Sequence, residues 1–219
     1  PITVTAASDN KVYDGIPLTN SSFSLTSGSL VEGHNLDVNV TGSQINVGSS
    51  PNIPSDAVLL EGEVDVTSNY AIIYVNGQLS VSPATGPSLT IESYNGVYDG
   101  EYHGIELDGI IDGDEMFFYL LGETESIEEI NWNEIDWSTI NPSFVNVGNR
   151  TILVKVVNQM YNDRTGIGTV AIAPRPITIT AGSASKVFDG QPLINDNYSM
   201  TSGSLVDGED IFDVIITGS

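Results

Sequence analysis

The chain has 219 residues and carries 29 Asp and Glu against 6 Lys and Arg, which gives a formal net charge of −23. Charge of this sign disfavours binding to nucleic-acid phosphates and to anionic lipid headgroups, so we expect no nucleic-acid partner. An apolar fraction of 40% supports packed cores, and the lack of Cys excludes disulfides, thiol nucleophiles and Cys-ligated metals. No apolar run approaches the roughly 20 residues that cross a bilayer, so we expect no membrane insertion.

Internal repetition organises the sequence. PITVTAASDNKVYDGIPL at residues 1–18 returns as PITITAGSASKVFDGQPL at residues 176–193, and a diverged copy between them carries VYDG at residues 97–100. Pro and small residues separate the copies, as is typical of linkers. The predicted domains are repeat one (residues 1–83), repeat two (84–174, with an insertion at 116–145) and repeat three (175–219, the first half of a repeat).

The opening segment of repeat one follows the period of a half-buried strand. Ile2, Val4 and Ala6 alternate with Thr3 and Thr5, and the corresponding segment of repeat three alternates in the same way. Both repeats are therefore predicted to open with a strand.

The end of repeat one carries a local turn signal. Asn76 and Gly77 stand between the runs AIIYV and QLSVS. Asn-Gly between two such runs is typical of a two-residue hairpin turn with positive φ at both central positions. The sequence therefore predicts a hairpin over residues 71–82.

Repeat two contains one irregular segment and one regular one. The apolar residues of SIEEINWNEIDW, residues 126–137, fit neither helical nor strand spacing, so we predict a loop with at most one helical turn. In TILVKVV, which begins at residue 151, Ile152, Val154 and Val156 would face one way. This pattern predicts a core strand.

Many short strands without a long helix predict an all-β fold of tandem Ig-like antiparallel β-sandwich modules arranged end to end. A β-grasp module is the alternative. A β-grasp sheet needs a helix of two or three turns to cover its apolar face, whereas a sandwich needs none. The missing helix favours the sandwich.

One tripeptide recurs in every repeat. Asp followed by Gly makes a tight turn in which Asp caps backbone amides and Gly takes a positive φ, while the aromatic ring packs against the module. Phe replaces Tyr in repeat three, so no hydroxyl is required and a structural role is favoured over binding. The copies are Tyr13, Asp14 and Gly15; Tyr98, Asp99 and Gly100; and Phe188, Asp189 and Gly190.

The segments around this tripeptide resemble a known family. KVYDGIPL at residues 11–18, GVYDGEYHG at 96–104 and KVFDGQPL at 186–193 are similar to the YDG and MBG repeat modules of large bacterial surface proteins, which are often adhesin-like. The resemblance implies an extracellular location on the bacterial cell surface. It also implies a stalk or spacer that projects a functional head, with neighbouring repeats of the same chain as its partners.

The chain offers little chemistry for catalysis. His34 and His103 occupy different positions in their repeats and accompany no recognisable Ser or Cys nucleophile motif. Carboxylate pairs such as Asp112 with Asp114 are expected by chance among 29 acidic residues. We therefore predict no enzymatic activity, no catalytic residues and no cofactor.

Calcium is the one metal that the composition keeps open, because acid-rich extracellular loops often supply oxygen ligands. The candidates are DGDE at residues 112–115 and DGED at 207–210. Neither has the alternating spacing of an EF-hand loop, and the matching loop of repeat one, EGHN at 32–35, is poor in carboxylates. We interpret these loops as solvated acidic turns.

Lys11 and Lys186 precede the tripeptide in repeats one and three, which raises the idea of an intramolecular Lys to Asn crosslink. Such a bond needs the lysine, an amide and a buried carboxylate in one core. Repeat two has Gly96 at this position. We therefore expect no crosslink as a shared feature.

Both tryptophans of the chain, Trp132 and Trp137, lie in the insertion of repeat two, beside Glu128, Glu129 and Glu134. Aromatic faces with nearby carboxylates suit sugar binding, so the alternative function is an adhesin module that binds host glycan or protein through this loop. The structural interpretation is that the two rings cover an open edge or end of the sandwich.

Repeat three lacks counterparts of residues 44–83. Segments of about 44 residues without a disulfide or metal seldom fold alone, and unpaired strands invite pairing with another chain. We therefore predict self-association through repeat three, by exchange between two such segments or by a lattice contact that covers its open sheet.

Overall fold

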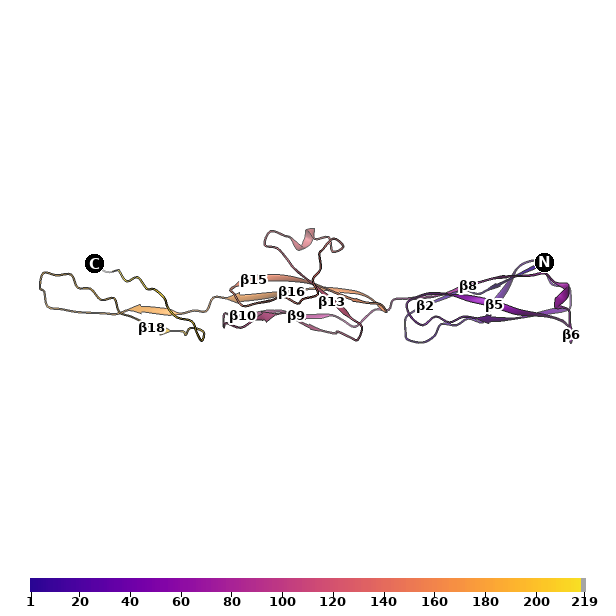
Figure 1. Cartoon of the computed structure of the whole chain (residues 1–219), viewed down its shortest axis with the longest axis horizontal. Coiled ribbons are helices and arrows are strands. Elements are labelled where there is room, and N and C mark those ends of the chain that lie inside the picture. Colours follow the sequence, from indigo (N-terminus) through magenta and orange to yellow (C-terminus); the bar gives the residue numbers. More distant parts are fainter. Residues whose placement is uncertain (218–219) are drawn as a thin grey trace. The chain divides into compact units, whose positions relative to one another are not determined.

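The computed structural model describes residues 1–217 (Figure 1). Residues 218 and 219, the last two of repeat three, lie outside this range. The chain divides into two compact units. Unit 1 comprises residues 1–88, 111–115 and 156–164, and unit 2 comprises residues 89–110, 116–155 and 165–219.

The described residues form strands and two short 3-10 helices. Repeat one contains β1 (Ile2–Ala6), β2 (Asp9–Val12), β3 (Phe23–Ser27), β4 (His34–Thr41), β5 (Gly48–Glu61), β6 (Val64–Asp65), η1 (Thr67–Asn69), β7 (Ile72–Val75) and β8 (Gly77–Ser82). Repeat two contains β9 (Thr90–Glu92), β10 (Tyr94–Val97), β11 (His103–Gly104), β12 (Glu106–Asp108), β13 (Glu115–Leu120), η2 (Ile127–Glu129), β14 (Ser143–Phe144), β15 (Gly148–Asn158) and β16 (Tyr161–Ala173). Repeat three contains β17 (Thr178–Ala181) and β18 (Tyr198–Ser202).

The all-β fold predicted from the sequence is confirmed. Within residues 1–217 the helices are the three-residue turns η1 and η2, and neither could cover a sheet as a β-grasp helix does. The turn η2 falls in the segment for which at most one helical turn was expected. In the same residues, no helix is long and apolar enough to cross a membrane.

Repeat one consists of two sheets around a shared core. One sheet has the strand order β3-β1-β7, and the other has the order β2-β8-β5-β4 with β6 paired to β5. The core between them is built by alternate residues of three strands, as a period of two dictates. Its buried members are Ile2, Val4, Val38, Ala57 and Leu59.

The strand pairing is mixed, whereas the sequence predicted antiparallel sheets. β1 pairs antiparallel with β3 but parallel with β7, and β2 pairs parallel with β8. The parallel pairs arise because the chain leaves one sheet after β1 and enters the other at β2. The segment that contains β7 and β8 passes between the same two sheets. It therefore stays beside the β1–β2 segment in both of them.

The predicted hairpin over residues 71–82 is wrong. β7 and β8 run in one direction, and neither Asn76 nor Gly77 has a positive φ. A Cβ on Gly77 would lie 2.2 Å from the carbonyl oxygen of Ala7 and 2.6 Å from that of Ala6. Glycine is therefore required by the close approach of two backbones at the sheet change.

Repeat two contains a four-stranded sheet of order β10-β16-β15-β13, in which β10 lies parallel to β16 as β2 does to β8 in repeat one. Ile152, Val154 and Val156 of β15 are fully buried, which confirms the predicted core strand. Leu153 points the other way and is fully buried too, so β15 is covered on both faces there.

The insertion predicted at residues 116–145 contains strand residues at both ends. Its outer residues belong to β13 and β14, and the irregular part spans residues 121–142, named here the insertion loop. It rises from the sheet that contains β13 and β15 (Figure 1). Two backbone hydrogen bonds between Phe118 and Ser138, of 2.7 and 2.9 Å, close its base.

Repeat three forms one antiparallel pair, β17 with β18. Its register and its irregularity between Thr178 and Ile179 copy those of β1 and β3, where the shift falls between Thr3 and Val4. The shared sequence thus gives the same local pairing in both repeats.

Candidate functional site

The recurrent tripeptide forms the same turn three times. In each copy the Asp carboxylate accepts a hydrogen bond from the backbone amide two residues further on, at Ile16, Glu101 and Gln191, over 2.9, 3.0 and 3.0 Å. The glycines have φ of 76°, 84° and 77°, a conformation that favours glycine over residues with a side chain. We name these three segments the YDG turns.

A lysine clamps the YDG turns of repeats one and three. Lys11 Nζ donates to Asp14, over 2.5 Å, and to the carbonyl oxygen of Ile16. Lys186 donates in the same way to Asp189 and to the carbonyl oxygen of Pro192, over 2.7 and 3.2 Å.

The lysine is the largest cause that lowers the pKa of the clamped carboxylate, ahead of the amide that the carboxylate accepts, in Asp14 and in Asp189. Lys11 and Lys186 thus each hold the YDG turn of their own repeat by hydrogen bonds. Neither ammonium donates to an Asn amide in these bonds, so they give the Lys to Asn crosslink no support.

Repeat two replaces the lysine by a histidine from another position. Gly96 stands where repeats one and three have Lys, and the ring of Tyr94 fills the space that a side chain there would need, since its hydroxyl would lie 2.3 Å from a Cβ. His103 stacks on that ring with centroids 3.7 Å apart and planes inclined by 10°. Its Nε2 lies 2.9 and 3.0 Å from the two oxygens of Asp99.

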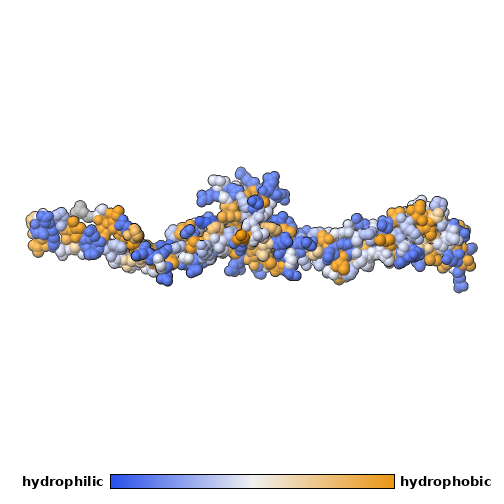
Figure 2. Space-filling model, viewed as in Figure 1, coloured by the Kyte–Doolittle hydropathy of each residue, from blue (hydrophilic) through white to orange (hydrophobic). Residues whose placement is uncertain are grey.

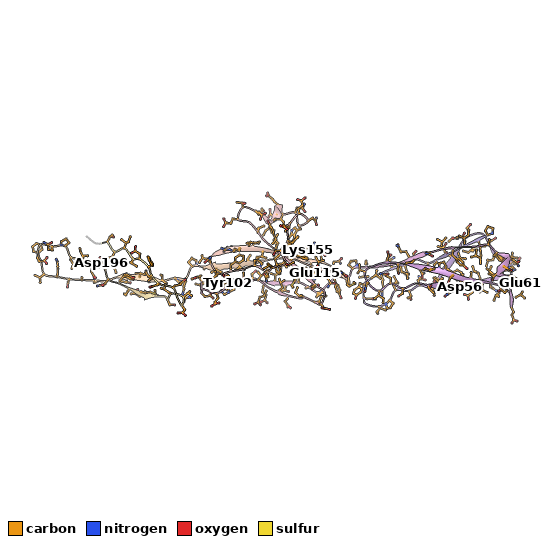
Figure 3. The ribbon with its side chains drawn as sticks, viewed as in Figure 1. Asp56, Glu61, Tyr102, Glu115, Lys155 and Asp196 are labelled. Atoms are coloured by element: carbon orange, nitrogen blue, oxygen red, sulfur yellow. The ribbon has the colours of Figure 1, made fainter. Side chains whose placement is uncertain are left out.

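His103 therefore takes the place of Lys11 in the YDG turn of repeat two, a role that the sequence did not predict. Tyr102, which precedes His103, lies at the surface of repeat two (Figure 3). It is 72% exposed. The pKa of Asp99 is lowered, first by the backbone amide of Glu101 and then by the imidazole of His103. Its carboxylate therefore stays ionised at neutral pH.

We expect the variant His103→Ala to loosen the YDG turn of repeat two alone, because it removes the imidazole that contacts both oxygens of Asp99. After correction for the intrinsic rate, the Glu101 amide should exchange with solvent faster in the variant than in the wild type, whereas the Ile16 amide should not.

The variant His103→Lys supplies the control, since it keeps a donor for the Asp99 carboxylate and should leave the Glu101 amide protected. Equal responses at Glu101 and Ile16 in His103→Ala, or a response as large in His103→Lys as in His103→Ala, would contradict the expectation.

The aromatic residue of the YDG turn has a different environment in each copy. In unit 1, Tyr13 packs against the core cluster of Leu18, Leu79 and Val81 and meets the Tyr161 ring edge-on at 5.9 Å. In unit 2, the Tyr98 hydroxyl donates to Glu209 over 2.6 Å, and this hydrogen bond raises the pKa of Tyr98. Phe188 is 93% exposed.

The first calcium candidate is an internal ion pair of unit 1. The side chain of Asp114 is fully buried and pairs with Arg164, whose guanidinium also donates to the carbonyl oxygen of Pro87 over 3.2 Å. Burial by itself would raise the pKa of Asp114. The Ile111 amide, Arg164 and Asn158 outweigh burial, so the pKa is lowered.

In the second calcium candidate, the carboxylate of Glu209 accepts hydrogen bonds from the protein. Besides accepting from Tyr98, Glu209 accepts a hydrogen bond from the backbone amide of Val206 over 3.3 Å. Across residues 1–217, no group of three or more His, Asp or Glu is placed to hold a metal ion. Asp114 and Glu209, one carboxylate of each candidate loop, thus accept from donors of the protein itself.

The structure brings Trp132 and Trp137 together in the insertion loop. Their ring centroids lie 5.7 Å apart with planes inclined by 38°, and both side chains are half-buried. Ser138, which follows Trp137, bonds to Phe118 at the base of the loop. The pair therefore packs as a small core of the loop.

Beside the pair lies an open concavity of about 570 Å³. Neither tryptophan lines it. Figure 2 shows that the outer surface of the insertion loop is mainly hydrophilic. Tyr119 donates to both oxygens of Glu125, over 2.8 and 2.9 Å, and Glu125 accepts from the Gly122 amide, which lowers its pKa most. The concavity is lined by Tyr119, Thr124, Glu125, Ser126, Glu129, Ile130, Asn131, Glu134, Ile135 and Asp136.

No family model and no curated protein matches the chain. Among solved structures it is similar to human mucin-like protocadherin EC1-2, at 10% identity and a TM-score of 0.27, over 78% of this chain and 98% of that one. It is also similar to the human desmocollin-1 ectodomain, at 14% identity and a TM-score of 0.21, over 81% of this chain and 41% of that one.

Proposed function

We propose that the chain is a non-catalytic stalk or spacer of the YDG and MBG repeat type, in an extracellular protein of a bacterial surface, and that it projects a functional head. One observation carries this proposal. In all three YDG turns the Asp carboxylate caps the turn and contacts a basic side chain of the same turn, Lys11, His103 or Lys186. A recurrent motif whose polar groups serve its own fold is typical of a structural repeat.

The charge distribution favours the same role. Repeat one carries eight Asp and Glu against one Lys, a net charge of −7, and repeats two and three carry −12 and −4. Neighbouring repeats therefore repel one another, which opposes folding back, although physiological salt screens charges beyond about 8 Å. Repulsion of this kind suits a spacer.

The spacer role is tested by displaying an epitope on cells at the end of the chain and measuring the binding of a bulky antibody. A Gly/Ser linker of the same length is the matched control, because it is flexible and collapses to a shorter mean distance. We expect more antibody bound per epitope on the chain than on the linker. Equal binding would argue against a spacer.

A second candidate function is an adhesin module that binds host glycan or protein through the insertion loop. The observation that favours it is the pairing of Trp132 with Trp137 beside the acidic concavity. Paired aromatic rings can stack on the apolar face of a sugar.

This candidate predicts binding of the full chain to a mucin or glycan array that is lost in the double variant Trp132→Ala and Trp137→Ala. The control variant Ile140→Ala changes a residue of the same loop that is 75% exposed and should keep binding. Binding by the chain and the control but not by the double variant would favour the adhesin over the stalk. No binding by the intact chain at any concentration would exclude the adhesin for these residues.

A further inference from the structure

Repeat three contains a formed but uncovered copy of the first half of repeat one. Beyond the shared register, the threonine hydroxyls of Thr180 and Thr201 lie 2.8 Å apart, as those of Thr5 and Thr26 do at 2.7 Å. The pair β17 and β18 therefore forms although no counterparts of β7 and β8 lie among the described residues of repeat three.

The residues that build the core of repeat one are exposed in repeat three. Val4 is 0% exposed and its counterpart Ile179 is 38% exposed, and Leu18 is 9% exposed and its counterpart Leu193 is 51% exposed. The space-filling view shows apolar side chains at the surface of this repeat (Figure 2). A surface of this kind calls for a partner.

Repeat one shows which strands cover such a surface. β7 lies parallel to β1, with Ile72 opposite Ile2 and Tyr74 opposite Val4, and β8 lies parallel to β2. Residues 184–187, the counterparts of β2, form no strand in repeat three. In repeat one β2 pairs with β8, and no counterpart of β8 lies among the described residues of repeat three.

The polar groups of repeat one restrict the partner further. Asn52 of β5, which is fully buried, donates to the carbonyl oxygens of Ala7 and Asn20 over 2.9 and 2.8 Å. The counterparts of these acceptors in repeat three are the carbonyls of Gly182 and Asn195. A complete partner therefore supplies a buried amide donor at this place as well as two apolar strand segments.

We propose that residues 177–194 form a strand-acceptor surface for the second half of a repeat of the same kind, bound through a segment of the β7–β8 type that lies parallel to β17. The segment is extended, has alternating apolar residues and carries glycine at the sheet change. The β7–β8 sequence AIIYVNGQLSVS contains no charged residue, which suits an acceptor whose repeat has a net charge of −4.

This occupant differs from the exchange between two copies of repeat three that the sequence suggested. Repeat three has no strand of the β7–β8 type to donate among its described residues. Two copies would also bring together surfaces of the same negative charge. The main-chain bonds of an added strand supply affinity, and the alternating side chains supply specificity.

The first test adds a fluorescent peptide with the sequence of residues 71–82 to the full chain and follows anisotropy and amide exchange. We expect saturable binding and exchange about tenfold slower at residues 178–181 and 184–187. The matched peptide carries Leu79→Asp and Val81→Asp, and should bind at least about tenfold more weakly. In the chain, Ile179→Asp should abolish binding, whereas Ile140→Asp in the insertion loop should not affect it.

A fusion protein guards against a peptide that binds too weakly to measure. The sequence of residues 44–83 is joined after residue 219, which raises its effective concentration to roughly millimolar. Slower exchange at residues 178–187 in this fusion, lost with Ile179→Asp, would support the acceptor surface. Exchange as fast as in the unextended chain, or peptide binding that Ile179→Asp leaves unchanged, would overturn it.

Discussion

Replacing Asp114 by Asn is expected to destabilise unit 1 by about 3–5 kcal/mol, the usual cost of removing one partner from a buried ion pair. The side chain of Asp114 is fully buried against Arg164, and its oxygens also accept from Ile111 and Asn158 over 2.8 and 2.9 Å. An amide in its place would leave the guanidinium without its counter-charge and turn an NH₂ group toward other donors. Thermal unfolding should occur roughly 10 °C or more lower.

The control for this variant is Asp112→Asn, which removes the same charge from an exposed residue of the same loop. It should change the melting temperature little, because exposed charges contribute little to stability. Similar melting of the two variants would show that the buried pair does not stabilise the chain.

The pH dependence of the Asp114 effect follows from the lowered pKa of its carboxyl. A carboxyl whose pKa is lowered by folding stabilises the fold above its unfolded pKa, and this contribution is lost as the pH falls through the folded value. The difference in melting temperature between wild type and Asp114→Asn should therefore be complete at pH 7 and shrink below about pH 4.

The sequence predicted those features of the fold that depend on local periodicity. Ile2 and Val4 alternate with threonine, and Ile152, Val154 and Val156 share one face, and all five are buried as expected. Repetition reinforced the assignment of the opening strand, because its pattern returns in repeat three. The all-β class followed from patterns of this kind.

The contacts of the candidate site could not be predicted in the same way, because they join residues far apart in sequence. Asp114 and Arg164 are 50 residues apart, and no period connects them. One signal of the ion pair was present in the composition. With 6 basic residues against 29 acidic ones, each basic residue is a candidate partner for a buried carboxylate. The loss of lysine at Gly96 was a similar signal for the role of His103.

The hairpin prediction failed because a strong local turn signal was overridden by tertiary structure. The sequence held the opposite signal in repeat two, where Gly168 corresponds to Gly77 and is preceded by Ile167. A β-branched residue does not suit the positive φ of such a turn. A Cβ on Gly168 would lie 2.6 Å from Ile91 and 2.7 Å from Ile105, so this glycine also marks a close approach.

The parallel course of β7 and β8 predicts that Gly77→Ala destabilises unit 1 by about 3 kcal/mol or more, above the usual cost of overpacking. The added methyl group would meet the carbonyl oxygens of Ala6 and Ala7 at 2.6 and 2.2 Å. Both atoms belong to backbone that is fixed by pairing in two sheets, so neither can move aside without breaking β1 or β2 away from its neighbours. Urea unfolding of the full chain, followed by tyrosine fluorescence, measures the loss.

The variant Asn76→Ala distinguishes the observed course of β7 and β8, which run in one direction, from a hairpin. Asn76 is exposed and has no positive φ, so its replacement should cost little where the chain passes straight from one sheet to the other. In a two-residue turn both positions need positive φ, and Asn76→Ala and Gly77→Ala would then each cost about 1 kcal/mol. A large loss for Gly77→Ala with almost none for Asn76→Ala is the result that the close backbone approach requires, and equal modest losses would restore the hairpin.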